Sequence, residues 1–194
     1  MTATQILDGI QDAYNKYSKL PSVSYNITTY LMDHDDFIWK LLKYNTADAW
    51  SPSKANLTKA EKGALIYKGV GAPTNSAFRV FFDAGMDGAW DIQATILRIS
   101  PVAVIPRNYV TGTQSIRFEV YTHSEINMLS NYNPRSLSII QKLIEVLNGA
   151  DIEGLGRIFF DYKASQYCRL TGVNVGNATY KGYELIMCNQ SLGG

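Results

Sequence analysis

The chain has 194 residues, of which 46% are hydrophobic and 18% charged, and this composition excludes a disordered protein. Its length suits one domain with a sizeable core. The 18 basic and 17 acidic residues give a net charge of +1, which excludes a strong field for nucleic acid. The low fraction of charged residues, together with 13 tyrosines and three tryptophans, indicates that other protein covers part of the surface. A larger core with ordinary exposed tyrosines would explain the same composition.

The apolar pattern predicts neither secretion nor membrane spanning. No basic segment followed by an apolar stretch opens the chain, and its longest apolar runs are interrupted by Arg98 or Asp161. Cys168 and Cys188 are the two cysteines, and they lack the spacing of a zinc ribbon or a redox motif. We therefore expect two free thiols in a reducing cytoplasm, where they serve as small core or sheet residues.

The first 44 residues show three apolar series at the helical period. Residues 3–17 predict an amphipathic helix that Pro21 closes, and residues 25–31 and 37–42 predict two more helices. The last two meet at an acidic cluster, residues 33–36, where Asp33 or Asp35 can cap the following helix. Trp39 lies off the main stripe, on a flank that either packs on the core or faces a partner.

A polar stretch then precedes a short helix. Residues 45–56 are polar and small and predict a loop. Thr58 and Glu61 have the spacing of a capping box, which predicts a short helix from there to about Tyr67. Gly69, Gly71 and Pro73 are expected to end this helix. Residues 1–70 are thus expected to be the helical part of the chain.

Beyond residue 75 the pattern becomes that of strands. Strands are predicted at 78–82, 92–99 and 102–105, with a turn at 85–88 between the first two. Pro101 interrupts the long apolar run, where a missing amide is tolerated only at an edge or a bulge, so we expect a bent strand there. Residues 115–123 give the clearest alternation and predict one buried and one solvated face.

The last third of the chain combines one helix with further strands. Asn133 as the cap and Pro134 in the first turn predict a helix over 134–148 that Gly149 ends. Strands are predicted at 158–162 and 182–188, with a turn region at 172–177 between them.

The fold class predicted is α+β in a single domain, 1–194. N-terminal helices precede a mainly antiparallel β-sheet or partly open barrel, which occupies 75–194, and the long helix 134–148 is inserted between its strands.

No group of residues indicates catalysis or ligand chemistry. The acidic cluster around His34 lacks the spacing of a calcium loop or a zinc helix, and a solvated helix start explains it. His123 lies beside Ser124 and Glu125, but nothing there predicts a nucleophile on a strained turn. Gly69-Val70-Gly71 is too short for a dinucleotide motif. Asp151 and Glu153 are expected to be solvated loop acids. We therefore predict no catalytic, cofactor-binding or metal-binding residue, and no enzyme.

Two stretches resemble a known family. The first is Asp35-Asp36-Phe37-Ile38-Trp39-Lys40-Leu41-Leu42-Lys43-Tyr44, followed by Asp48-Ala49. The second is Asn133-Pro134-Arg135 with its helix, followed by Leu147-Asn148-Gly149-Ala150-Asp151-Ile152-Glu153-Gly154-Leu155-Gly156. They resemble the neck or connector-ring proteins of tailed bacteriophages, including those of crAss-like phages. The two stretches cover about a third of the chain, and neither contains residues that chemistry requires.

The resemblance implies a structural virion protein of the portal–tail neck, of the adaptor, stopper or tail-terminator type. Such a protein would assemble in the host bacterial cytoplasm as a homo-oligomeric ring, contact the portal or neighbouring neck and tail proteins, and line the channel through which DNA passes. A closed ring needs contacts between two different faces of the subunit.

The loop 45–56 and the turn 172–177 are the segments expected to supply these contacts. The candidate interface residues are Trp39, Trp50 and Tyr109, because aromatic anchors dominate many interfaces, and Asn174 in the turn. Alternatively, Trp39 closes the core, and Trp50 and Tyr109 lie along the surface. The other function that the sequence allows is a small soluble module that binds a ligand or peptide without catalysis.

Overall fold

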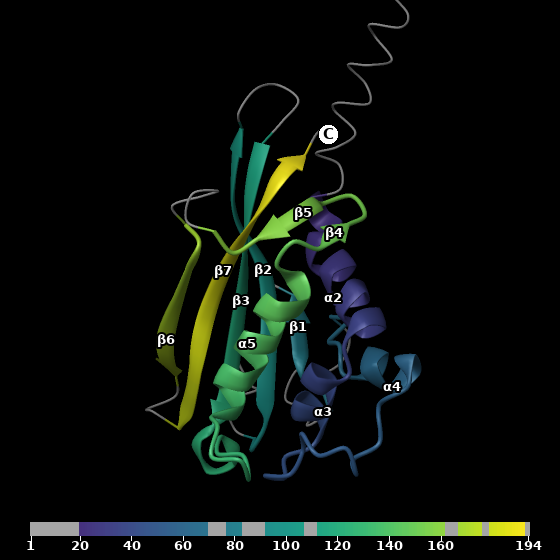
Figure 1. Cartoon of the computed structure of the whole chain (residues 1–194), viewed down its shortest axis with the longest axis vertical. Helices are drawn as coiled ribbons and strands as arrows, with labels where there is room; N and C mark the ends of the chain where they lie inside the picture. The colour runs from purple at the N-terminus through teal and green to yellow at the C-terminus, as the bar shows by residue number, and fades with distance from the viewer. Residues whose placement is uncertain are drawn as a thin grey trace, which may run out of the picture.

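The structure is a computed structural model, and it describes residues 20–69, 77–82, 92–106, 112–161, 167–175 and 179–192 (Figure 1). Its helical segments are η1 (Leu20–Ser22), α2 (Val23–His34), α3 (Phe37–Lys43), α4 (Lys59–Ala64), η3 (Ser124–Ile126) and α5 (Arg135–Leu147). Its strands are β1 (Val80–Phe82), β2 (Thr95–Pro106), β3 (Gly112–His123), β4 (Asp151–Ile152), β5 (Gly156–Phe159), β6 (Arg169–Val175) and β7 (Tyr180–Leu192). The predicted helix 3–17, the predicted turn 85–88 and Tyr109 lie outside the described residues.

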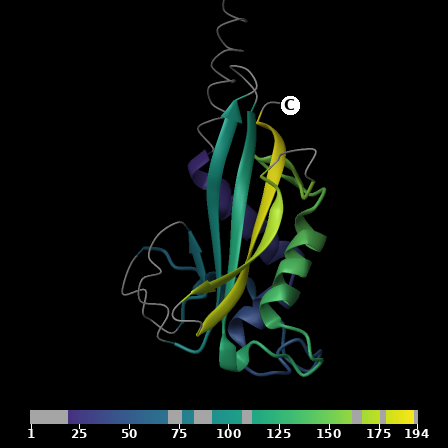
Figure 2. The same cartoon turned by 90° about the vertical axis from the view of Figure 1, so that its left-hand side faces the viewer.

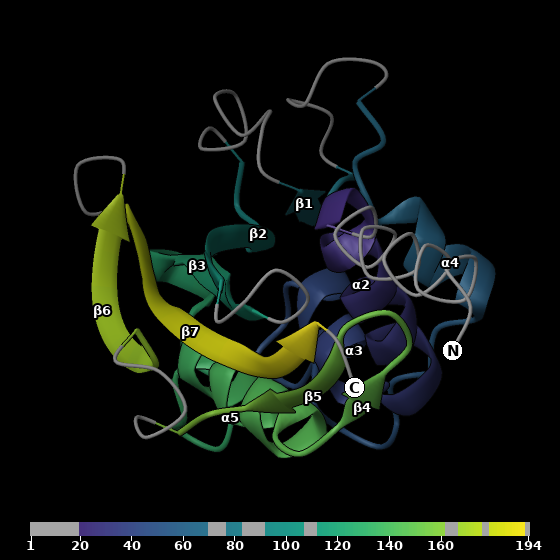
Figure 3. The same cartoon turned by 90° about the horizontal axis from the view of Figure 1, so that it is seen from above.

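The seven described strands form one sheet in the order β1-β2-β3-β7-β5-β4, and β6 pairs with β7. β1 runs parallel to β2, whereas all the other recorded pairings are antiparallel. Seen from above, the sheet is strongly curved, with α2, α3 and α5 on one side (Figure 3). The α+β class, the mainly antiparallel sheet and the long helix inserted between strands are therefore confirmed.

The main hydrophobic core lies between these helices and the sheet. It contains side chains of α2, α3 and α5 together with inward residues of β2, β3 and β7, so the helical and β-rich parts share one core. The β2–β3 hairpin runs along the length of the molecule with α5 to one side (Figure 2). Its β2 strand changes register against β3 between Pro101 and Ala103, so Pro101 lies at a bulge, one of the two settings that the sequence allowed.

Two of the predicted capping residues bind amides in the first turn of a helix. The Asp35 carboxylate accepts a hydrogen bond from the Ile38 amide of α3 at 2.6 Å, although Asp36 occupies the capping position. Thr58 and Glu61 form the capping box of α4. That helix ends at Ala64 rather than near Tyr67, because the chain turns there and Ile66 pairs with β1 in a parallel bridge.

The start of α5 differs from its prediction. Pro134 occupies the capping position and its backbone is extended, so Asn133 is not the cap. The Asn127 side chain instead accepts hydrogen bonds from the amide and the hydroxyl of Ser136, both at 3.1 Å. The capping acceptor comes from the preceding loop, nine residues away, and a local sequence rule does not reach that far. Gly149 follows the helix with a φ of 87°, which agrees with its predicted role at the C-terminus.

Both faces of β3 are covered, so the prediction of one solvated face was wrong. Glu119 is 7% exposed and Tyr121 is 6% exposed, although both point away from the helices. Two kinds of neighbour cover this face. A second apolar cluster packs around Tyr121 and Tyr180, and ion pairs between neighbouring strands cover the remainder. Only a long-range sheet pairing brings these neighbours together.

Residues 169–175 form strand β6, and this corrects the predicted turn region at 172–177. β6 pairs with β7 in antiparallel register, from Arg169 opposite Ile186 to Val175 opposite Tyr180. The glycine and asparagine in this segment favoured a turn locally. Pairing with the long strand β7 outweighs that preference.

Candidate interaction surfaces

The loops that join α3 to α4 and η3 to α5 lie at the lower end of the molecule in Figure 1. They carry three exposed large apolar side chains. Trp50 is 37% exposed, Met128 is 57% exposed and Tyr132 is 87% exposed. The Trp50 indole donates a hydrogen bond to the Ser130 hydroxyl at 2.9 Å, and the Ser130 amide donates to the Ala47 carbonyl at 2.9 Å. These bonds join the two loops, and we call Trp50, Met128 and Tyr132 the basal patch.

The loop at the centre of this patch holds Tyr132 in an unfavourable backbone conformation. Tyr132 has a φ of 64°, and it is the one non-glycine residue with positive φ among those described. A bulky residue there costs free energy that the surrounding bonds must offset. Its amide donates to Leu129 at 2.9 Å, and the Leu129 amide donates to Asn133 at 3.1 Å. The loop therefore holds an aromatic ring in solvent at a cost in stability, as binding loops often do.

The buried guanidinium of Arg135 fixes the loops beneath the basal patch. Arg135 has no exposed surface and donates to the carbonyls of Leu41, Tyr44, Thr46 and Ile126, at 2.9, 2.5, 2.7 and 3.0 Å. Burial lowers its pKa to about 10, so it remains charged at neutral pH. Arg135 thus fastens the end of α3 and the following loop to the start of α5.

A second exposed apolar surface lies at the far end of the β2–β3 hairpin. Val102, which the register shift at the bulge leaves without a partner residue on β3, is 37% exposed, and Ile105 beyond it is 39% exposed. A strand of this length spans about 40 Å at the usual rise per residue. This pair, which we call the distal patch, therefore lies at the opposite end of the molecule from the basal patch (Figure 1).

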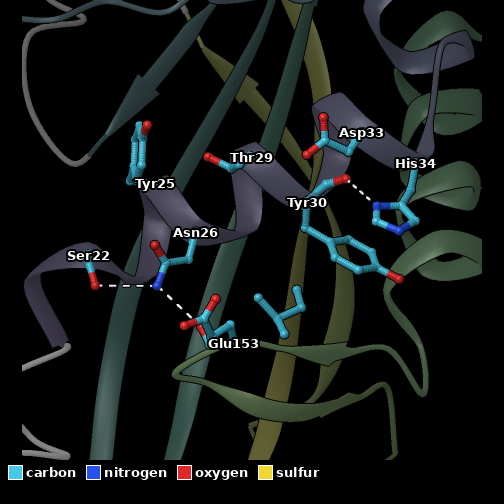
Figure 4. Close-up of a pocket in the computed structure, with 9 residues that line it drawn as sticks. Ser22, Tyr25, Asn26, Thr29, Tyr30, Asp33, His34 and Glu153 are labelled. Atoms are coloured by element: carbon cyan, nitrogen blue, oxygen red, sulfur yellow. Dashed lines mark hydrogen bonds between the residues drawn. The ribbon is translucent and has the colours of Figure 1, made fainter.

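A polar hollow of about 410 Å³ lies beside α2 and the β4–β5 turn (Figure 4). The Tyr30 and His34 rings stack with centroids 3.9 Å apart, and His34 Nδ1 donates to the Tyr30 carbonyl at 2.9 Å. The Asn26 amide donates to Ser22 Oγ and to the Glu153 carbonyl, both at 3.4 Å. These groups could hold a small polar ligand, but most of them already bind one another.

The acidic cluster at 33–36 does not converge on one point. The Asp33 carboxylate pairs with Lys59 at 2.7 Å, and this hydrogen bond is the main cause that lowers its pKa. Asp36 pairs with Lys62 at 2.6 Å. Within the described part of the chain no group of three or more histidine, cysteine or carboxylate side chains is placed to hold a metal ion.

The second histidine also has a structural setting. The Nδ1 atom of His123 accepts a hydrogen bond from the Glu125 amide at 3.4 Å, and its ring packs edge-on against Tyr180.

Of the helices that the structure describes, none has both the length and the apolar character needed to cross a bilayer.

The structure gives different settings to the three sequence-predicted interface residues that it describes. Trp39 is 1% exposed and donates from its indole to the Leu31 carbonyl at 3.1 Å, so it closes the core and cannot face a partner. Trp50 lies in the basal patch. Asn174 is exposed on the edge strand β6 rather than in a turn, and Tyr109 lies outside the described residues.

Sequence reasoning missed most of the two patches. Met128, Tyr132, Val102 and Ile105 were not singled out. The pattern Asn131-Tyr132-Asn133-Pro134 could have indicated an aromatic side chain at the tip of a turn. No sequence pattern indicates that Val102 and Ile105 are exposed, because the same residue types occur at exposed and at buried positions of a strand.

The two stretches that resemble neck proteins meet in space. Arg135, in the second stretch, donates to Leu41 and Tyr44, which belong to the first. A protein-family model described as YomW matches residues 35–188, a range that contains both stretches. The family name indicates a phage-related protein. Comparison with curated proteins finds no match.

Proposed function

The chain belongs to the YomW family, and on that premise we propose that it is a structural virion protein of the phage neck. In this proposal many copies form a ring between portal and tail, as an adaptor, stopper or tail terminator, and DNA passes through the ring. The protein would assemble in the host bacterial cytoplasm, work in the virion and catalyse no reaction.

The observation that carries the proposal is the pair of apolar patches at opposite ends of one subunit. Exposed apolar side chains favour contact with another protein, and Tyr132 is held in solvent by a costly backbone conformation. A ring contact is heterologous, because one face of a subunit meets a different face of the next. The basal patch and the distal patch supply two such different faces.

The charge of the chain suits a channel component. With 18 basic and 17 acidic residues there is no excess positive charge to hold a phosphate backbone tightly. A ring that DNA must pass through benefits from weak contact with it. The low charged fraction of 18% also suits a surface that other subunits cover.

The proposal is tested by imaging native particles and by measuring the mass of the purified chain with light scattering. We expect a closed ring of this chain in the neck of the particle. A double substitution in the basal patch, Met128→Ser with Tyr132→Ser, should prevent incorporation into particles. The matched control is Tyr25→Ser, which replaces a 58% exposed side chain on α2 outside both patches and should leave assembly intact. A chain absent from purified particles would overturn the proposal.

The polar hollow of Figure 4 supports the second function, a soluble module that binds a small ligand. Its volume of about 410 Å³ lies within the range of small-molecule sites, roughly 300–1,000 Å³. This function predicts a chain that stays monomeric in the infected cell and gains thermal stability from a small polar compound. Asn26→Ala should then abolish that gain, whereas the ring proposal predicts no effect of Asn26→Ala on assembly.

A further inference from the structure

The two cysteines, which are 20 residues apart in sequence, touch in the folded protein. Cys168 Sγ donates to Cys188 Sγ at a distance of 2.9 Å. Cys168 is 8% exposed and Cys188 is fully buried, and both are free thiols. A disulfide needs its sulfurs about 2.05 Å apart. The pair thus lies within about one ångström of bonding distance, and the sequence spacing gave no sign of this.

The pair sits where β7 changes its partner strand. The upper part of β7 pairs with β5, through Phe159 opposite Cys188, and the lower part pairs with β6, from Arg169 opposite Ile186. Cys168 immediately precedes β6, and its thiol also points to the Phe159 carbonyl at 3.8 Å. A bond between the thiols would therefore fasten the start of β6 to the middle of the sheet.

β6 is the strand that gains most from such a bond. Among the described residues its recorded pairing is with β7 alone, and Arg169, Leu170 and Asn174 are exposed. Edge strands held by one ladder open more readily than central ones. An open β6 would expose Leu170, which is already 41% exposed.

We propose that Cys168 and Cys188 are a disulfide-forming pair that stays reduced in the cytoplasm and closes when the protein meets a peroxide. The thiolate of Cys168 attacks the peroxide oxygen and breaks the O–O bond, which gives a sulfenic acid and releases water after proton transfer. The Cys188 sulfur, losing its proton, then attacks the sulfenic sulfur and displaces a second water. Two thiols and one hydrogen peroxide give one disulfide and two waters. This proposal does not depend on the neck role.

The surroundings of the pair make the reaction slow at neutral pH. Burial, aided by the hydrogen bond to Cys188, raises the pKa of the Cys168 thiol to about 12. The thiolate is the reactive form of cysteine. At pH values below this pKa, the thiolate fraction increases tenfold for each unit by which the pH rises, and the oxidation rate should increase with it. Folded protein should therefore oxidise more slowly than unfolded chain, whose thiols titrate at about 8.5.

The experiment incubates the folded full chain with hydrogen peroxide, unfolds it in denaturant with an alkylating agent and maps the peptides. We expect a Cys168–Cys188 cross-linked peptide, a rate that rises about tenfold per pH unit from pH 7 to pH 9, and slower amide hydrogen exchange in β6 alone. Retention of two alkylatable thiols, or sulfinic acids without a cross-link, would overturn the proposal.

Two variants keep the outcome interpretable. Cys168→Ala should give neither the cross-link nor the protection of β6, while hydrogen exchange in α5 stays unchanged. Cys188→Ala tests the same bond from the other side. Protection of β6 by peroxide in either variant would show that the effect arises elsewhere and would also overturn the proposal.

Discussion

Phe118 and Glu119 are neighbours in β3, and both are buried, but their side chains enter different surroundings. Phe118 has no exposed surface and packs among aliphatic side chains beneath the helices. Glu119 points to the other face, where it pairs with Arg98 at 3.1 Å and accepts from the Tyr121 hydroxyl at 2.9 Å. One face is stabilised by close apolar packing and the other by polar groups that satisfy one another.

The difference shows what each face tolerates. Apolar packing is sensitive to shape, because removed atoms leave a cavity. The polar face is sensitive to pairing, because an unmatched buried charge costs more than a matched pair contributes. Substitutions on the two faces should therefore differ in size and in their response to salt.

The largest effect is expected on the helix-covered side, at Arg135. Arg135→Ala removes the donor that four backbone carbonyls share and should lower the free energy of unfolding by about 4–5 kcal/mol. Denaturant unfolding followed by circular dichroism measures it. Arg135→Lys retains one cationic donor group and should lose less, which keeps the test usable where the alanine variant fails to fold. A loss under about 1 kcal/mol for alanine would contradict the role of Arg135 as a fastener.

Phe118→Ala should be the next most damaging change. Removing a fully buried phenylalanine should cost about 3–4 kcal/mol, with no dependence on salt, and unfolding curves at low and high salt check this. Phe118→Leu is the matched control and should cost about 1 kcal/mol, since it keeps most of the volume. Equal losses for the two variants would mean that the packing at this site is loose.

A smaller loss of stability, which unlike that of Phe118→Ala depends on salt, is expected on the polar face. Glu184 pairs with Arg117 at 3.0 Å and with Arg169 at 2.9 Å, and its side chain is 12% exposed. Glu184→Gln should cost about 1–2 kcal/mol, less at high salt, because it leaves two arginines facing each other. The control is Glu145→Gln in the exposed pair with Lys142, which should change stability by under about 0.5 kcal/mol. A larger loss in the control would refute the contrast between buried and exposed pairs.

The smallest effect is a pH dependence at the junction of α2 and α3. Burial raises the pKa of Asp35, so the folded protein holds this proton more tightly than the unfolded chain does. Its contribution to stability is therefore greatest at low pH and is lost as the pH rises through the folded pKa. Asp35→Asn keeps an acceptor for the Ile38 amide and removes the charge. The stability of this variant relative to the native chain should rise between about pH 3 and pH 7.

Asp33→Asn provides the opposite sign. The hydrogen bond from Lys59 is the main cause that lowers the pKa of Asp33, so this variant should lose stability relative to the native chain over the same pH interval. Thermal unfolding measured across the interval follows both variants. Parallel slopes for the two variants would disprove the assignment of these pKa shifts.

Local signals in the sequence were sufficient where the interaction spans a few residues. The capping box of Thr58 and Glu61, the hydrogen bond from the Ile38 amide to Asp35 and the helix stop at Gly149 all form between near neighbours. Of the interface candidates, Trp50 was singled out because it is an aromatic residue in a polar loop, and the structure leaves it partly exposed.

The sequence by itself therefore determined the class of the fold and the approximate positions of α2, α3, α4 and α5, since both follow from residue period and short-range hydrogen bonds. Tertiary structure decided the rest. It buried Trp39, covered the second face of β3, converted residues 169–175 from an expected turn into a strand and brought Cys168 against Cys188. Each of these features depends on residues far away in the chain. The residue pattern of a strand does not reveal which strand it will pair with in the sheet.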